Sequence, residues 1–221
     1  TFEDNLLSSI TNAVDAITQG VKTSEITEVR LSTTLTTNLL VQNKQEKTAV
    51  VVAAGPGIHP GRFRIGDLYE VVAGGIDHQG YEIEKLDEEE IKTFLNDLHT
   101  EGISVLAAVT KFSTRNPAHE NRIQEIVSDT CDFLSLGHRL SGKPNFPRRI
   151  NTAYFNSAVW RKHKDFVEAV QSGFQEMGIS APLTMLKADG GTMPVEYSKS
   201  YPVQTILSGP SASVMGALAL N

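Results

Sequence analysis

The sequence predicts an α/β fold in which a largely parallel sheet carries helices on both faces. Strand-length segments alternate with segments of helical periodicity along the 221 residues, as they do in successive βαβ units. Two of the strand-like segments, 48–54 and 103–109, are almost continuously apolar. Such runs are typical of strands buried on both faces of a parallel sheet. We therefore expect these two segments to be fully buried central strands.

Helices are expected where apolar residues recur every three or four positions, or where capping residues precede such a pattern. Leu6, Ile10, Val14 and Ile17 show this spacing, and Gly20 follows the segment. At Asp87, a capping side chain precedes three glutamates that favour the positive end of a helix dipole. The predicted helices are residues 2–19, 34–42, 87–101, 118–130 and 146–177, the last in one or two pieces.

Strands are expected where apolar and polar residues alternate, or where β-branched residues form an apolar run bounded by turn residues. Residues 26–31 alternate, which indicates a half-buried strand. Gly and Pro are frequent between 55 and 66, which indicates a long loop. The predicted strands are residues 26–31, 47–54, 69–73, 81–83, 103–109, 133–136 and 183–187.

Composition excludes several classes of protein. Apolar residues make up 40% of the chain and charged residues 21%, which is too apolar for a disordered protein. The formal net charge of -6 gives no electrostatic reason to expect nucleic acid or an anionic membrane as a partner. Cys131 is the single cysteine, so an internal disulfide is excluded and a reducing cytoplasm is favoured. The longest apolar runs are far shorter than the roughly 20 residues that cross a membrane.

The C-terminal segment contains two small-residue turns that predict a binding site. In each, an apolar approach runs into glycine: Asp189-Gly190-Gly191 is the first turn, and Ser208-Gly209 opens a helix of small residues. Glycine lets backbone N–H groups approach a ligand, and a helix N-terminus attracts an anion. The alternative is a tight structural corner, because Gly and Ser also mark ordinary turns.

Two polar segments earlier in the chain are further candidates. Thr33, Thr34, Thr37 and Asn38 could present hydroxyls and an amide to a substrate, although capping of a helix explains them equally well. For His119-Glu120 and the preceding Asn-Pro, helix capping is the favoured interpretation, with Glu120 near the positive helix end.

Two further groups of residues are interpreted as structural. The pair 148–149 is interpreted as a solvated helix face, and Cys131 as a buried, inert thiol. The sequence contains no histidine pair at i, i+4 and no Cys-x-x-Cys, so no metal site is predicted from it.

Four motifs follow one another along the chain. They are Thr33-Thr34-x-x-Thr37-Asn38, Asn116-Pro117-Ala118-His119-Glu120, Ile150-Asn151-Thr152-Ala153-Tyr154, and Asp189-Gly190-Gly191 followed by Ser208-Gly209-Pro210-x-Ala212-x-Val214-x-Gly216-Ala217. In this order they resemble the hydantoinase/oxoprolinase family (hydantoinase A, N-methylhydantoinase and 5-oxoprolinase). The resemblance implies an actin-like fold of the sugar kinase and heat-shock ATPase superfamily, which is ribonuclease H-like. It also implies an N-terminal-type domain at 1–140 and the start of a hydantoinase A-type domain at 146–221, separated by the turn-rich residues 141–145.

The same resemblance implies an ATP-dependent cytoplasmic hydrolase that phosphorylates the amide oxygen of a hydantoin-like or 5-oxoproline-like ring and opens it. Asp189, Gly190 and Gly191 would then line a nucleotide or substrate cleft, and Ser208 to Ser211, with Gly209 among them, would brace the helix behind the second of the family's phosphate hairpins. ATP and Mg²⁺ are the implied cofactors, a cyclic amide the substrate, and a hydantoinase B-type subunit a possible partner.

The family's two Asp-x-Gly-Gly-Thr phosphate hairpins are not found in this chain. We therefore expect an internal fragment that binds no cofactor and is inactive by itself, and the catalytic residues stay unassigned. The alternatives are a kinase-like phosphotransferase of the same superfamily and a non-catalytic scaffold.

Overall fold

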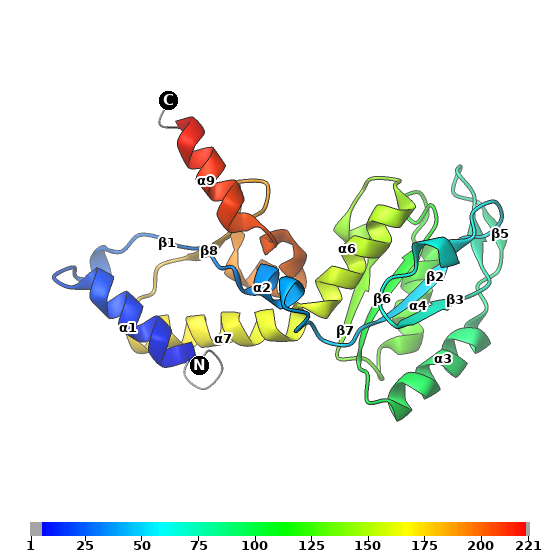
Figure 1. Ribbon diagram of the computed structural model, residues 1–221, viewed down its shortest axis with the longest axis horizontal. Coiled ribbons are helices and arrows are strands. Elements are labelled where there is room, and N and C mark those ends of the chain that lie inside the picture. Colours follow the sequence, from blue (N-terminus) through cyan, green and yellow to red (C-terminus); the bar gives the residue numbers. More distant parts are fainter. Residues whose placement is uncertain (1–5, 220–221) are drawn as a thin grey trace. The chain divides into compact units, whose positions relative to one another are not determined.

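The computed structural model describes residues 6–219, which divide into two compact units (Figure 1). The central unit is Gln45–Ala158. The terminal unit combines the residues before Gln45 with those from Val159 onward. No helix within 6–219 has the length and apolar character needed to cross a membrane.

A four-stranded parallel sheet forms the centre of the central unit, in the order β3-β2-β6-β7. Every residue of β2 and β6 is buried, and both strands lie between two neighbours. The prediction of two buried central strands is therefore confirmed. The strands are β2 (Ala49–Ala53), β3 (Leu68–Val71), β6 (Val105–Thr110) and β7 (Phe133–Leu136).

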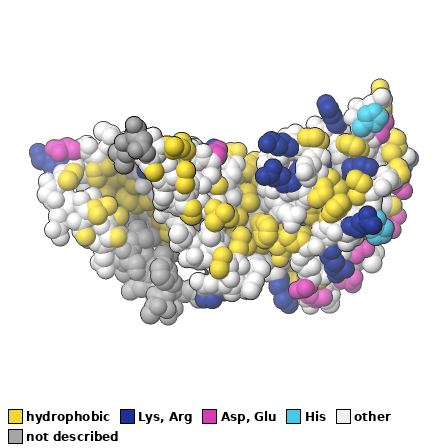
Figure 2. All heavy atoms as spheres, turned by 45° about the horizontal axis from the view of Figure 1, so that its top comes forward, with side chains coloured by type: hydrophobic (Ala, Val, Ile, Leu, Met, Phe, Trp, Pro, Cys, Tyr) yellow, Lys and Arg dark blue, Asp and Glu magenta, His cyan; other side chains and the backbone are white. Residues whose placement is uncertain are grey.

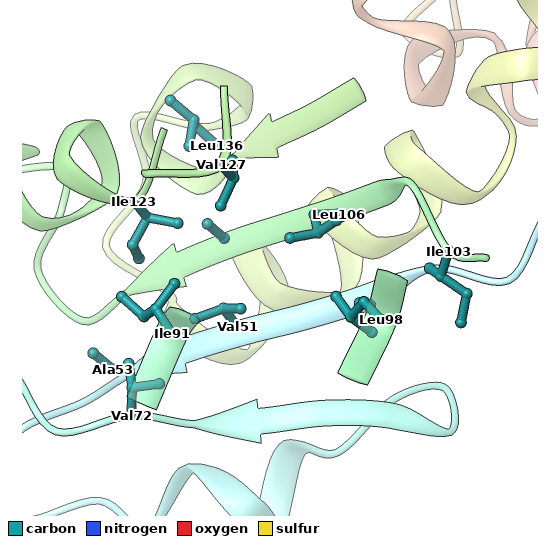
Figure 3. Packing of buried hydrophobic residues seen from close by; sticks show 12 residues of the cluster. Val51, Ala53, Val72, Ile91, Leu98, Ile103, Leu106, Ile123, Val127 and Leu136 are labelled. Atoms are coloured by element: carbon teal, nitrogen blue, oxygen red, sulfur yellow. The ribbon is translucent and has the colours of Figure 1, made fainter. Parts of the chain in front are cut away.

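Helices cover both faces of this sheet because successive strand residues point to opposite sides. Val51 and Leu106 pack against Ile91 and Ile123 of the helices on one face (Figure 3). Val50 and Val52 belong to the cluster on the other face. The first face is covered by α3 (Glu88–Thr100) and α4 (Ala118–Val127), the second by α6 (Phe146–Ala158). The predicted α/β class with helices on both faces is confirmed.

Two shorter features complete the central unit. Asp87 caps α3 as predicted, because its carboxylate accepts the N–H groups of Glu89 and Glu90 at 3.0 and 3.1 Å. A hairpin of β4 (Gly75–Ile76) and β5 (Glu82–Glu84) follows β3. Its first strand was not predicted, and neither was the one-turn helix α5 (Gly137–Leu140). A 3-10 turn, Pro60–Phe63, lies in the predicted long loop.

The terminal unit contains a smaller mixed sheet in the order β1-β8-β9. β1 pairs with β8 in parallel, and β8 forms an antiparallel hairpin with β9. The strands are β1 (Val29–Leu31), β8 (Leu183–Leu186) and β9 (Thr192–Pro194). The helices are α1 (Leu6–Thr18), α2 (Leu35–Val41), α7 (Trp160–Glu176), α8 (Val195–Ser200) and α9 (Ser208–Ala219), with 3-10 turns at Thr23–Glu25 and Pro202–Thr205.

Apolar packing between α1 and α7 supports this second sheet. Val14 of α1 joins Val170 and Phe174 of α7 in one buried cluster, with Leu183 of β8 at its edge. The helix predicted at 146–177 is in two pieces, because α6 ends at Ala158 and α7 begins at Trp160. Residues 2–5 of the first predicted helix lie outside the described residues.

The boundaries of the compact units differ from the predicted domain boundary at 141–145, because the units divide after Lys44 and after Ala158. Residues 141–145 lie between α5 and α6, inside the central unit. The assignment of family domains to 1–140 and 146–221 concerns segments of sequence, and it stays a prediction.

Candidate functional site

The turn between β8 and β9 contains three of the predicted site residues. Gly190 has a φ of 85°, a left-handed conformation that favours glycine. Asp189 accepts hydrogen bonds from the N–H of Gly191 at 2.9 Å and from Lys187 Nζ at 2.8 Å. These two donors lower the pKa of the Asp189 carboxyl, with Lys187 the larger cause. The carboxylate therefore stabilises its own turn, in which Ala188, Asp189 and Gly191 are exposed.

The helix α9 packs against this turn. Ser211 Oγ donates a hydrogen bond to the carbonyl oxygen of Ala188 at 2.7 Å. A Cβ at Gly190 would lie 2.7 Å from Cγ of Met215, so glycine is also required for the close approach of the helix. The two small-residue turns that the sequence analysis singled out are thus brought together in the terminal unit.

The threonine segment meets the same place from the other end of the chain. Thr37 Oγ1 accepts the N–H of Leu207 at 2.9 Å. Thr36 and Thr205 share a buried hydroxyl–hydroxyl bond of 2.9 Å. A Cβ at Gly209 would lie 3.9 Å from Thr34 Cγ2. The beginnings of α2 and α9 are therefore adjacent.

The remaining polar groups of the threonine segment bond mainly within it. Thr33 Oγ1 accepts the N–H of Leu35 at 3.1 Å, and Thr34 Oγ1 accepts from Asn38 Nδ2 at 3.2 Å. The side chains of Thr34 and Asn38 are exposed. Local capping therefore explains Thr33, while Thr34 and Asn38 are accessible to a ligand.

Ser208 and Leu207 show the features that accompany functional sites. Ser208 is 1% exposed, and its Oγ has no hydrogen-bond partner within residues 6–219. Leu207 has a φ of 62°, which is uncommon for a residue with a Cβ. Strained backbone of this kind clusters at binding sites, and an unsatisfied buried polar atom requires an explanation.

The N-terminus of α9 can hold an anion. The N–H groups of Ser208 and Gly209 have no acceptor within the helix, and the dipole of α9 is positive at this end. Pro210 has no N–H, and the N–H of Ser211 donates to the carbonyl oxygen of Leu207 at 3.2 Å. The neighbouring hydroxyls of Thr34 and Ser208 add donors. No cluster of three His, Cys, Asp or Glu side chains in the described part of the chain could hold a metal ion. A Mg²⁺ ion at this site would depend largely on phosphate and water oxygens, as Mg²⁺ sites often do.

The central unit contains a buried charge cluster around Glu120. Glu120 lies in the first turn of α4, as predicted, and its side chain is fully buried. Its carboxylate accepts the N–H of Thr110 and the N–H of His138, both at 2.8 Å, and bonds His138 Nδ1 at 2.6 Å. Arg149 Nη1 lies 3.8 Å from Glu120 Oε1.

The interpretation of residues 148–149 as a solvated helix face is wrong for Arg149. This side chain is fully buried, whereas Arg148 is exposed. Its guanidinium donates to Ser113 Oγ and, at 3.1 Å, to the carbonyl oxygen of Thr110. A signal for Glu120 existed in the sequence: it shares a helix face with Ile123 and Val127, at spacings that place all three towards the core. The favoured capping interpretation is confirmed for Asn116, whose Oδ1 accepts the N–H of Ala118 at 3.0 Å, and for Glu120, which lies in the first turn of α4.

Basic residues follow three of the four parallel strands. The connections after β2, β6 and β7 (55–66, 111–117 and 137–149) contain no Asp or Glu, whereas the connection after the edge strand β3 is acidic. Figure 2 shows several Lys and Arg side chains on one face of the central unit. The basic residues of these three connections are Arg62, Arg64, Lys111, Arg115, Arg139, Lys143, Arg148 and Arg149. We call the three connections the basic edge.

Two protein-family models match the chain. A model described as the hydantoinase/oxoprolinase N-terminal region matches residues 1–131, and a model described as hydantoinase/oxoprolinase matches residues 149–221. The chain belongs to the hydantoinase/oxoprolinase family.

Relatives in this family are much longer than the chain. The caprolactamase subunit alpha of Pseudomonas jessenii is 24% identical over 155 residues, which cover 69% of the chain and 22% of the relative. The acetophenone carboxylase gamma subunit of Aromatoleum aromaticum is 27% identical over 158 residues, which cover 68% of the chain and 21% of the relative. The 5-oxoprolinase 1 of Arabidopsis thaliana is 24% identical over 235 residues, which cover 90% of the chain and 18% of the relative.

Two solved structures share the fold. The ATP-dependent caprolactamase from Pseudomonas jessenii matches with a TM-score of 0.81 at 20% identity, over 96% of the chain and 35% of that structure. A nucleotide-free acetone carboxylase, from a study of ATP-dependent acetone carboxylation, matches with a TM-score of 0.82 at 19% identity. The match covers 100% of the chain and 36% of that structure. The hydantoinase/oxoprolinase chain therefore spans about a third of these structures.

Proposed function

We propose that this chain forms part of an ATP-dependent hydrolase that opens a hydantoin-like or 5-oxoproline-like cyclic amide by phosphorylating its amide oxygen. Membership of the hydantoinase/oxoprolinase family supports the proposal. So do relatives named as a caprolactamase and a 5-oxoprolinase. Another relative is named as a carboxylase subunit, so the family includes more than one reaction. Family membership therefore does not identify the substrate, and the cyclic amide is part of our proposal.

The observation that carries the proposal is the meeting of three segments at the start of α9. Thr37 Oγ1 receives the N–H of Leu207, Ser211 Oγ bonds the turn at Ala188, and Ser208 Oγ is buried without a partner in the described chain. These contacts place a helix N-terminus, a glycine turn and exposed threonine side chains together. Such a combination suits the oxygens of a phosphoryl group.

Each group at this place has a defined part in the proposal. Bound ATP with Mg²⁺ would supply the phosphoryl group that makes the amide carbon electrophilic. The N–H groups at the start of α9 would bind phosphate oxygens, and the Thr34 hydroxyl would orient the ligand. Gly209 would let the backbone come close, since a Cβ there meets little protein. Positioning and neutralisation of charge supply most of the catalysis in reactions of this kind.

Two alternatives make different predictions for the full-length protein. A kinase-like phosphotransferase would transfer phosphate to a stable product, and a scaffold member would not turn over ATP. The relatives named as alpha and gamma subunits also support a partner subunit, which we propose to be of the hydantoinase B type. Purification of the full-length protein with and without a co-expressed partner therefore forms part of the test.

The test measures ADP and ring-opened product together. Full-length protein is incubated with ATP, Mg²⁺ and one of hydantoin, 5-oxoproline or caprolactam, and products are identified by mass spectrometry. We expect ADP and ring-opened acid in equal amounts for one of these amides, and strong loss of both in Gly209→Ala. Gly216→Ala is the matched control, because Gly216 lies on the same helix with nothing within 4 Å. Phosphorylated product without ring opening, or no ATP turnover with any partner, would reject the hydrolase.

A further inference from the structure

The strand order of the central unit creates a crevice position that the proposed function does not use. β2 and β6 are neighbours in the sheet, although β3 lies between them in sequence. The chain leaves β2 for β3 on one side and returns to β6 on the other. At such a reversal the connections diverge, and α/β proteins bind ligands at the carboxyl ends of the two strands. Here those ends lead into residues 55–66 and 111–117 of the basic edge.

Backbone contacts hold the two connections together at this position. The N–H of Lys111 donates to the carbonyl oxygen of Ala53 at 2.8 Å, and Lys111 Nζ donates to the carbonyl oxygen of Pro56 at 2.9 Å. A Cβ at Gly55 would lie 2.9 Å from Cα of Gly75, so backbone passes close to backbone. Phe112 has a φ of 62°, which is strained for an aromatic residue. The ends of β2 and β6 are thus tightly constrained.

Two buried polar groups at the end of β6 lack partners. Thr110 is 1% exposed and Arg149 is fully buried. Thr110 Oγ1 and Arg149 Nε have no hydrogen bond within the described residues, although the rest of the Arg149 guanidinium bonds Ser113 and the Thr110 carbonyl. Unsatisfied buried donors are costly, and a bound acceptor would relieve the cost.

The charge balance at this position favours an anion. Glu120 is the one carboxylate of the cluster, and Arg149 with the donors around it matches its charge. Lys111 Nζ lies 5.1 Å from the centroid of the Phe112 ring and donates one hydrogen bond to Pro56, and it forms no ion pair with any carboxylate in 6–219. Two of its three N–H donors remain for a ligand, and no carboxylate neutralises its charge.

We propose that the central unit has its own anion site at the carboxyl ends of β2 and β6, where Lys111 and Thr110 bind a phosphate or carboxylate group of a small molecule. The site lies wholly within residues 45–158 and shares no residue with the α9 site of the terminal unit. The bound anion would accept hydrogen bonds from Lys111 Nζ and Thr110 Oγ1, and Lys111 would supply the positive charge.

The test uses the 221-residue chain and two simple anions. Backbone amide NMR spectra are recorded while inorganic phosphate or acetate replaces chloride at constant ionic strength. We expect saturable shifts at Gly55, Gly57, Lys111 and Ser113 with at least one anion. Lys111→Met should raise the Kd about tenfold, as loss of a charge-assisted hydrogen bond does. Saturation by phosphate alone assigns a phosphate group to the ligand, and saturation by acetate alone assigns a carboxylate.

Two further variants separate a site from general attraction. Lys47→Met removes an exposed charge at the opposite, amino end of β2 and should change the Kd less than twofold. Thr110→Val keeps the shape and removes only the unpartnered hydroxyl, so it should fold normally and still weaken the anion. Equal weakening by Lys47→Met and Lys111→Met, unchanged binding in both Lys111→Met and Thr110→Val, or shifts that rise linearly without saturation would overturn the proposal.

Discussion

The hydroxyl of Thr37 accepts the backbone N–H of Leu207 at 2.9 Å, although the two residues are 170 positions apart. This bond satisfies the N–H directly before α9 and fixes the helix to the start of α2. It also holds Leu207 in its left-handed conformation, with a φ of 62°. A hydroxyl that the sequence offers equally as a cap or as a substrate contact is therefore used to join two distant segments.

Replacing Thr37 by valine should loosen the start of α9. The variant keeps the β-branched shape and removes the acceptor, so the N–H of Leu207 loses its partner at a cost of about 1 kcal/mol. Amide hydrogen exchange at Leu207 should become faster, and the urea midpoint should fall slightly. Thr33→Val is the control, because its hydroxyl bonds only the adjacent Leu35. Unchanged exchange at Leu207 would show that the bond contributes nothing.

Alanine at Gly190 and alanine at Gly209 should behave differently. Gly190 has a φ of 85° and lies against Met215, so Gly190→Ala should destabilise the fold by on the order of 1 kcal/mol and lower activity. Gly209 is not strained, and a Cβ there comes no closer than 3.9 Å to Thr34. A loss of turnover per folded molecule in Gly209→Ala therefore reports ligand contact more directly.

The measurement for these two glycines is turnover of the full-length enzyme divided by the folded fraction, beside each unfolding midpoint. Normal turnover in both variants would mean that these turns are structural, and that the phosphate oxygens bind elsewhere.

Glutamine at position 120 should destabilise the central unit strongly. Glu120 and Arg149 are fully buried, and removing one charge leaves the other without its partner, which costs about 3–5 kcal/mol. Glu125→Gln on the same helix is the control, because Glu125 pairs with Arg122 at the surface and should change the stability by less than about 1 kcal/mol. Chemical denaturation of both variants decides the point, and similar midpoints would refute the buried charge cluster.

His163 should make the terminal unit sensitive to acid. Burial lowers the pKa of His163 from 6.5 to about 4, and its Nε2 lies 2.9 Å from Ser198 Oγ. Between these two pKa values the unfolded chain binds a proton that the folded chain does not. The contribution to stability is therefore complete above pH 6.5 and is lost as the pH falls to about 4, by roughly 3 kcal/mol.

The measurement is the free energy of unfolding of the wild type and of His163→Gln at pH 7, 5.5 and 4. Carboxylates contribute equally to both proteins, so the difference between the two curves isolates His163. Parallel curves would contradict the lowered pKa.

The class of fold and the positions of its main elements follow from local patterns in the sequence. Continuous apolar runs had only one stable place, the interior of a parallel sheet, and β2 and β6 occupy it. The capping of α3 by Asp87 was also predictable, because the donors and the acceptor are within three residues of each other in the sequence. Motifs in a fixed order were also sufficient to indicate the family.

The roles of polar residues that are distant in sequence depend on the folded chain. The sequence singled out Thr37, Gly190 and Ser208 separately, and the fold brings their segments together through the contacts of α9. It also buries Glu120 and Arg149 within 3.8 Å of each other, where the sequence suggested a carboxylate at a helix N-terminus and a solvated arginine. A charged side chain is buried only if a partner neutralises it, and that partner comes from a different element. Pairing of this kind depends on chain topology, which local sequence patterns do not contain.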